Sequence, residues 1–159
     1  MIVVEVEAEA PGWTQALPEV EALTEAAATA AARSLGPRAD GAYVVLLADD
    51  AVVRDLNARF RGKDQPTNVL SFPAAEGASE PGAEPAKGDI VLAYETCAAE
   101  AQAQGKPLAH HLQHLVVHGV LHLLGFDHMD DAEAETMETR EREVLAGLGV
   151  PDPYARSTG

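Results

Sequence analysis

The chain has 159 residues, 47% of them hydrophobic and 23% charged, which predicts one globular domain large enough to bury a core. It contains no run of eighteen apolar residues, so we expect no membrane-spanning helix. The formal net charge of −15 argues against a polyanionic partner, because nucleic-acid binding depends heavily on neutralising phosphates with basic side chains.

The amino-terminal segment and the single cysteine both point to the cytoplasm. Residues 1–10 lack the basic start and apolar centre of a signal peptide, and they alternate between apolar and polar types as a strand does. Cys97 cannot form a disulfide within the chain, which fits a reducing compartment. Its simplest interpretation is a small buried apolar residue.

The first half of the chain is predicted to alternate strands and helices. A strand over residues 2–7 is broken by Pro11 and Gly12, and the alanine-rich residues 18–35 predict a scaffold helix. The continuous apolar run of residues 42–48 predicts a strand that is covered on both faces.

The next predicted helix, residues 51–61, has turn signals at both ends. Asp49 or Asp50 can cap its amino-terminal end, and Gly62 ends it. Three apolar residues are expected to face the core: Val53, Leu56 and Phe60.

Two further strands, 68–72 and 90–93, flank a segment rich in glycine, proline and acidic residues. That segment, residues 73–87, is expected to be a flexible acidic surface loop. A helix over residues 94–104 follows the second of these strands, and Gly105 ends it.

The last part of the chain is predicted to hold two helices. The first begins at Pro107 and runs to Leu124, with leucine and valine side chains for burial. The residues Asp-Asp-Ala-Glu at 130–133 resemble a capping box, which starts a second helix that reaches about residue 146. Residues 150–159 are expected to form a frayed tail.

All six histidines lie within residues 110–128. His118 and His122 are four residues apart and so share one face of a helix, where both imidazoles can bind one divalent metal. Gly125 can adopt the left-handed conformation that ends the helix, so that the chain turns back and presents His128 as a third ligand. Three histidines, with a fourth position left to water, are typical of a catalytic zinc site.

The same ligand spacing occurs in a class of zinc proteases, with one difference. Those enzymes carry glutamate directly after the first histidine as general base, whereas this chain has Gly119, which has no side chain to take a proton. The pattern therefore predicts metal binding and disfavours peptidase chemistry.

Other polar groups near the motif are candidates for proton transfer or ligand orientation. His114 lies one turn before His118 and can act in acid–base catalysis, orient a ligand or play a structural role. Asp127 can orient a ligating imidazole or cap the turn. His110 and His111 lie in the first turns of the helix and are expected to be exposed.

A cluster of basic residues offers a phosphate site elsewhere in the chain. Four of the eleven basic residues lie within ten positions: Arg54, Arg59, Arg61 and Lys63. They form either a basic patch on an acidic protein or the solvated end of a helix. Arg61 can hold phosphate oxygens with its planar guanidinium, or it can satisfy the last carbonyls of its own helix. The spacing leaves both interpretations open.

Three sequence motifs together resemble those of a known family. They are R-G-K-D-Q-P-T-N-V-L-S-F (61–72), G-D-I (88–90) and H-G-V-L-H-L-L-G-F-D-H (118–128). These segments, within a match over roughly residues 40–145, are similar to the YbeY family of bacterial metal-dependent endoribonucleases.

The resemblance implies a zinc ion held by His118, His122 and His128, and it places the family's key arginine at Arg61. It also implies cleavage of single-stranded RNA in the maturation of ribosomal RNA, especially at the 3′ end of the small-subunit RNA, and a role in ribosome quality control. The ribosome or its proteins would then supply part of the affinity for RNA that the acidic chain lacks.

We therefore expect a single α/β (α+β) domain over residues 1–159, with a four-stranded mixed sheet and about five helices. The metal-bearing helix would pack on the sheet, and its histidine face would line a cleft. The expected chemistry is hydrolysis of an RNA phosphodiester, with one zinc ion per chain. The proton would be moved by His114, by Asp127 or by the 2′-hydroxyl of the substrate. The residues expected to bind RNA are Arg59, Arg61 and Lys63.

Two other functional classes stay open. A metallohydrolase of peptides or another small substrate predicts metal-dependent peptide cleavage that does not depend on Arg61. A non-catalytic ribosome-assembly factor with a structural zinc predicts that loss of a ligand unfolds the protein and that the purified chain cleaves nothing.

Overall fold

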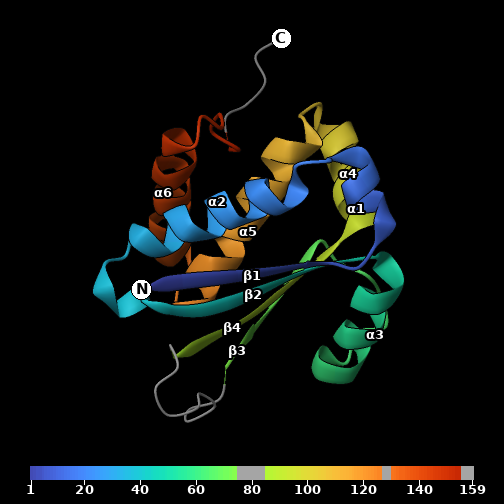
Figure 1. The fold of residues 1–159 in the computed structure, drawn as a ribbon, viewed down its shortest axis with the longest axis horizontal. Helices are drawn as coiled ribbons and strands as arrows, with labels where there is room; N and C mark the ends of the chain where they lie inside the picture. Colours follow the sequence, from blue (N-terminus) through green and yellow to red (C-terminus); the bar gives the residue numbers. More distant parts are fainter. Residues whose placement is uncertain (75–84, 127–129, 155–159) are drawn as a thin grey trace.

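The computed structural model describes residues 1–74, 85–126 and 130–154. Within them, one four-stranded mixed sheet and six α-helices form a single α/β unit (Figure 1), which confirms the expected fold class. The strand order is β1-β2-β4-β3, with β3 antiparallel at one edge and the other pairs parallel. The strands are β1 (Ile2–Ala8), β2 (Gly41–Ala48), β3 (Val69–Pro73) and β4 (Ala86–Ala93).

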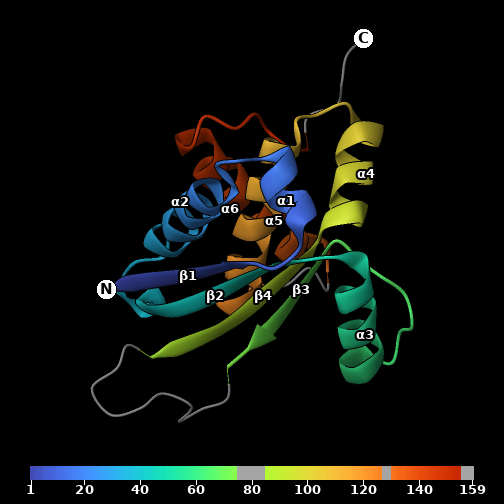
Figure 2. The same ribbon diagram turned by 45° about the vertical axis from the view of Figure 1, so that its right-hand side comes forward.

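Helices lie on both sides of the sheet (Figures 1 and 2). α2 and α5 pack on one face with α6 against them, whereas α3 lies on the other side. The helices are α1 (Pro11–Ala16), α2 (Val20–Arg33), α3 (Asp50–Arg61), α4 (Tyr94–Gln104), α5 (Leu108–Leu123) and α6 (Asp131–Gly147), with a short 3-10 helix, η1 (Pro37–Ala39). None of the helices in the described ranges is long and apolar enough to cross a membrane.

The core is divided unequally between the two faces of the sheet. Tyr43, Val45 and Leu47 of β2 are fully buried on the face that α2 and α5 cover. Val44 and Leu46, on the opposite face, are only partly buried. The prediction that β2 is covered on both faces is therefore confirmed in full for one face only. On the other face, the smaller core cluster beneath α3 lies near the carboxyl end of the strand and leaves the rest of it partly exposed.

Residues 11–16 form α1, where the sequence predicted only a break after the first strand. Pro11 stands at the first position of this helix, where its missing N–H would have no partner within the helix in any case. Trp13 is fully buried, and its Nε1–H donates to the carbonyl of Ala48 at 2.9 Å. This long-range contact, rather than local propensity, holds the short helix in place.

The predicted signals at the ends of α3 are confirmed. An oxygen of Asp49 accepts a hydrogen bond from the N–H of Val52 at 2.9 Å, and Gly62 ends the helix with a φ of +69°. The prediction that Phe60 faces the core is wrong, since its side chain is 67% exposed. The last turn of α3 meets the ring of Phe72 on the edge strand instead of the closed core.

The end of the chain also differs from expectation. Val150 is buried, and Tyr154 packs its ring against His114 with 5.3 Å between the ring centroids. Residues 150–154 therefore fold back onto the helices. The hydroxyl of Tyr154 donates to the buried carboxylate of Glu141, and this hydrogen bond compensates for the water that the side chain loses. Of the predicted acidic loop at 73–87, Ala86 and Lys87 belong to β4, while residues 75–84 and 155–159 lie outside the described residues.

Candidate active site

α5 brings two of the three predicted metal ligands together. The rings of His118 and His122 are nearly parallel, with 6.2 Å between centroids and 8° between planes, as expected for side chains one turn apart. Gly125 has a φ of +100°, and the N–H of Phe126 donates to the carbonyl of Leu121 at 3.1 Å. The helix thus ends where the sequence predicts. The third predicted ligand, His128, and its neighbour Asp127 lie outside the described residues.

Gly119, which replaces the protease glutamate, is a packing position against the sheet. A Cβ atom built at this residue would lie 2.9 Å from Cγ2 of Ile90 on β4, closer than real Cβ contacts. The carbonyl of Gly119 also accepts a hydrogen bond from the hydroxyl of Ser71 at 3.5 Å. A side chain at position 119 would therefore point into the sheet, and no general base can stand there.

A buried carboxylate on α6 contacts the first predicted ligand. Glu141 is fully buried, and its Oε1 lies 2.6 Å from Nδ1 of His118. Its Oε2 accepts a short hydrogen bond from the hydroxyl of Tyr154. Nε2 of His114 lies 3.4 Å from the same oxygen and 3.2 Å from the hydroxyl oxygen of Tyr154. One buried acid therefore connects two histidines of α5 to α6 and to the chain that follows it.

The charge of Glu141 determines which ring nitrogen of His118 carries the proton. Burial raises the pKa of Glu141, but hydrogen bonds from His114, His118 and Tyr154 outweigh it and lower that pKa to about 2. The carboxylate is thus charged at neutral pH and can only accept, so Nδ1 of His118 carries the proton. Burial also raises the pKa of Tyr154 well above its usual value, which keeps the hydroxyl as a donor. A metal would therefore bind His118 through Nε2, since Nδ1 donates to Glu141.

The donor set fits a divalent transition metal such as zinc. Ligating histidines in zinc sites usually give their other ring N–H to a carboxylate or carbonyl, and the pair of His118 and Glu141 has this arrangement. The ranges 1–74, 85–126 and 130–154 contain no cluster of three potential ligands in metal-binding positions. A complete site would therefore need a further ligand, and His128 is the residue predicted to supply it.

Sequence reasoning missed Glu141, although a signal was available. It lies four residues after the buried Met137 and three or four before the buried Val144 and Leu145, so it belongs to the apolar stripe of α6. An acid on such a stripe needs a partner, because an unpaired buried charge is costly. Because residues 130–143 contain many other acidic side chains, the sequence did not distinguish Glu141 from the exposed ones.

His114 and His111 are both held away from solvent. The side chain of His114 is 13% exposed, and its Nδ1 has no hydrogen-bond partner among the residues that the structure describes. His111, predicted to be exposed, is buried, and its Nε2 lies 2.9 Å from an oxygen of Glu100 on α4. The first turn of α5 packs against α4, which explains the difference, and the resulting burial lowers the pKa of His111. Glu100 also accepts a hydrogen bond from Asn68, in the first family-like motif segment (61–72), at 3.0 Å.

Arg61 does not satisfy the carbonyls at the end of its own helix. The backbone N–H groups of Gly62 and Lys63 occupy two of those carbonyls. The Nη2 of Arg61 instead donates to the backbone carbonyl of Ser71 on the edge strand β3 at 3.3 Å. Since Ser71 also contacts Gly119, the residue after His118, Arg61 is connected to the histidine helix through one residue.

The four clustered basic residues have different partners. Arg54 pairs with Asp64 at 2.8 Å, and Arg59 pairs with Asp55 at 3.2 Å, both on the surface. Within the described parts of the chain, Arg61 and Lys63 form no ion pair. Two positive charges at the end of α3 therefore stay available for an anionic ligand.

The loop after α3 is fixed by a residue that sequence reasoning did not single out. Asn57 is only 3% exposed, and its side-chain amide donates to the carbonyl of Gln65 at 2.8 Å. The carbonyl of Lys63 in turn accepts from the N–H of Gln65 at 2.9 Å. The loop that carries Lys63 is thus closed onto α3 by hydrogen bonds.

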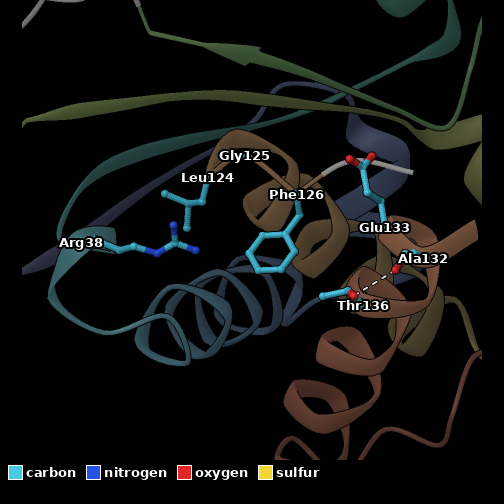
Figure 3. Close-up of a pocket in the computed structure, with 7 residues that line it drawn as sticks. All are labelled: Arg38, Leu124, Gly125, Phe126, Ala132, Glu133 and Thr136. Carbon is cyan, nitrogen blue, oxygen red and sulfur yellow. Dashed lines mark hydrogen bonds between the residues drawn. The ribbon is translucent and has the colours of Figure 1, made fainter. Parts of the chain in front are cut away.

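Residues of α6 help to line two cavities, one beside His118 within α5 and one beside Phe126, after the end of α5. His118 lines one of about 280 Å³, together with Met137, Glu138 and the Glu141–Tyr154 pair, so one of the predicted ligands lines a cleft. The other, of about 360 Å³, lies beside Phe126, over whose ring Arg38 places its guanidinium carbon at 5.9 Å (Figure 3).

Comparison with known proteins gives consistent matches over most of the chain. The sequence model of a family described as "Endoribonuclease YbeY" matches residues 8–149. Proteins of that name from Paramagnetospirillum magneticum and Azorhizobium caulinodans are 53% and 54% identical, covering 91% and 96% of this chain and 90% and 96% of their own. One from Rhodopseudomonas palustris is 56% identical over 89% of this chain and 86% of its own. The solution structure of TM1509 from Thermotoga maritima is similar with a TM-score of 0.54 and 25% identity, covering 98% of this chain and 100% of that one.

Proposed function

Because this chain belongs to the endoribonuclease YbeY family, and is thus a nuclease that acts on RNA, we propose that it is zinc-dependent, cuts single strands and matures ribosomal RNA. The observation that supports the proposal best is the connection of Arg61 to the histidine helix through Ser71. This contact brings a cation without a carboxylate partner in the described residues to the edge of the site. A phosphodiester that binds there can meet both groups.

The histidines would hold the metal and the chain would orient them. His118, His122 and His128 would hold a zinc ion, which would supply Lewis-acid chemistry to the cleavage. The carboxylate of Glu141 holds the ring of His118 through Nδ1, so that Nε2 keeps its direction. Tyr154 holds that carboxylate in place from the other side.

Arg61 would bind the phosphate next to the bond that breaks. A guanidinium has five N–H donors, and the hydrogen bond to Ser71 uses one of them. The remaining donors can contact phosphate oxygens and stabilise the negative charge that develops in the transition state. Lys63 would contact a neighbouring phosphate of the strand, whereas Arg59 would have to leave the carboxylate of Asp55 to do so.

His114 is our candidate for moving a proton, since Gly119 cannot. It contacts both Tyr154 and Glu141, which gives it a path for a proton within the cluster. The ends of the RNA products would identify the nucleophile. Attack by the 2′-hydroxyl of the substrate leaves a cyclic phosphate or a 3′-phosphate, and a DNA strand of the same sequence is not cut.

The proposal is tested by cleavage of a single-stranded RNA by the wild type, Arg61→Ala and His118→Ala, with the metal content of each measured. Arg61→Ala should keep its metal and its fold and lose about 100-fold in kcat, the usual effect of removing one charge-stabilising donor. The matched control is Arg33→Ala, which removes an exposed arginine at the end of α2. If all four proteins cut alike, the activity comes from a contaminating nuclease, and the non-catalytic assembly factor replaces our proposal.

The same proposal places the protein with ribosomes in the cytoplasm. An acidic chain with few available cations gains little affinity from phosphate contacts alone, so ribosomal proteins would supply the rest. Cells that lack the protein should accumulate small-subunit RNA with an unprocessed 3′ end, which mapping of that end detects. A normal end in such cells would exclude this role.

A further inference from the structure

Two phenylalanines, of which one is exposed and the other partly buried, form an aromatic pair beside Arg61. The ring of Phe60, at the end of α3, lies edge-to-face against the ring of Phe72 on β3, with 5.5 Å between centroids and 64° between planes. Phe72 packs against the small core cluster beneath α3, whereas Phe60 is 67% exposed. One ring is therefore anchored, and it holds the other at the surface.

The aromatic pair lies next to Arg61, the arginine proposed to bind phosphate, and each of the two rings has its own connection to it. Phe60 precedes Arg61 on α3, and Phe72 follows Ser71 on β3. Arg61 and Ser71 are themselves joined by a hydrogen bond. Phe60 and Arg61 of α3 thus contact neighbouring residues of the edge strand β3. One of these residues, Ser71, also contacts the histidine helix at Gly119.

The charges around the pair favour an anionic ligand, although the whole chain is acidic. The cations Arg54 and Arg59 are neutralised by carboxylates nearby on α3 and its loop, which leaves Arg61 and Lys63. Asp89, the cross-strand neighbour of Phe72, is the one acid that the register places beside the anchored ring. The end of α3 therefore keeps a net positive charge beside an apolar aromatic surface.

We propose that Phe60 and Phe72 form a stacking platform for an unpaired RNA base, adjacent to the phosphate that Arg61 binds. The proposal rests on the proposed function and names how the same site recognises its substrate. Aromatic side chains bind single strands by stacking on bases, which all have a π-face, while cations beside them hold the backbone. In a duplex the base faces are covered by their neighbours, so the platform selects single strands over double strands.

The test compares Phe60→Ala, Phe60→Leu and Phe60→Trp in cleavage of a short single-stranded RNA, with KM and kcat measured separately. Loss of one stacked base should raise KM about fivefold to 100-fold in Phe60→Ala and leave kcat nearly unchanged. Phe60→Leu keeps an apolar side chain without a π-face and should behave as Phe60→Ala does. Phe60→Trp should bind at least as tightly as the wild type. Val52→Ala, at another exposed apolar position of α3, is the matched control and should change nothing.

A fluorescence measurement tests stacking directly. The one native tryptophan, Trp13, is fully buried and cannot stack on a base, so quenching seen in Phe60→Trp and not in the wild type belongs to the introduced indole. Single-stranded RNA should quench its emission, and an RNA whose bases have been removed should not. Melting curves of each variant show that the fold is intact, as expected for changes at an exposed side chain.

The outcomes separate this proposal from the one on which it rests. If the wild type and Arg61→Ala cut RNA alike, the proposed function itself fails. If Arg61→Ala loses activity while Phe60→Ala keeps the wild-type KM and the introduced indole is not quenched, only the platform is overturned. The aromatic pair would then be a surface for another kind of partner, such as a protein.

Discussion

The imidazole of His118 and the carboxylate of Glu141 meet at 2.6 Å, between Nδ1 and Oε1, across 23 residues of sequence. The contact assigns the proton of the ring to Nδ1, so a metal would bind through Nε2. It also links α5, which carries two of the predicted ligands, to α6, which carries none of them.

We predict that Glu141→Gln lowers zinc affinity about 10-fold to 100-fold, because an uncharged amide accepts a weaker hydrogen bond from Nδ1 and makes the ring less basic. Competition for zinc with a chelating dye measures the change without any use of activity. Glu143→Gln, at an exposed position of the same helix, removes one negative charge as well and serves as control. Equal zinc affinity in the two variants would show that Glu141 does not position the ligand.

Gly119→Ala should destabilise the fold, although alanine is the better helix former. The added methyl group would meet Ile90 at 2.9 Å, and overpacking costs about 1–3 kcal/mol, of which helix propensity returns about 1 kcal/mol. Gly147→Ala is a sharp control, because the same methyl group at the end of α6 meets nothing within 4 Å and should be neutral or slightly stabilising. Urea unfolding of both variants measures the two changes, and a stabilised Gly119→Ala contradicts the packing argument.

Tyr43 should make the free energy of unfolding fall at alkaline pH. Burial, with a smaller contribution from Asp40, raises the pKa of this phenol to about 12, against about 10 in an unfolded chain. The folded protein therefore holds the proton longer, and the stabilisation is complete below pH 10 and is lost as the pH rises from about 10 to 12. Its hydroxyl also donates to the carbonyl of Ala39 at 2.6 Å.

Tyr43→Phe tests this by removing the titrating group. It should cost about 1 kcal/mol at neutral pH, the usual contribution of one hydrogen bond, and unfold with a flatter dependence on pH above 10. All other tyrosines are unchanged, so the difference between the two pH curves belongs to Tyr43. Parallel curves for the two proteins would exclude it as the source.

Zinc should stabilise the wild type by mass action and leave His122→Ala unaffected. A ligand that binds only the folded state adds about 2.7 kcal/mol at 100 times its Kd. Thermal melts with and without zinc measure this, and both metal-free proteins should unfold cooperatively, because the main core cluster is built of apolar side chains from the sheet and its helices. A metal-free chain with no cooperative transition would instead favour a structural zinc.

The features that sequence reasoning predicted well depend on local signals. Asp49 and Gly62 mark the ends of α3, and Gly125 marks the end of α5, because caps and left-handed residues act within one helical turn. The spacing of His118 and His122 likewise fixes their common face. The order of strands and helices follows from patterns of the same short range.

The features that it missed depend on contacts between distant segments. The exposure of Phe60 depends on where α3 lies relative to the edge strand β3. The hydrogen bond of Arg61 depends on the position of Ser71 in that strand. The order of Tyr154 depends on a buried acceptor that only the packing of α6 on α5 creates. The local sequence pattern does not show which distant residues will come into contact.

The closure of the site by Glu141 and Tyr154 has a consequence for the time at which the enzyme gains activity. During synthesis, His118 and His122 leave the ribosome before the carboxylate that orients one of them and the hydroxyl that holds that carboxylate. A growing chain therefore carries these two predicted ligands before the groups that hold them, and the ribosomal RNA around it meets the complete cluster only after α6 has packed.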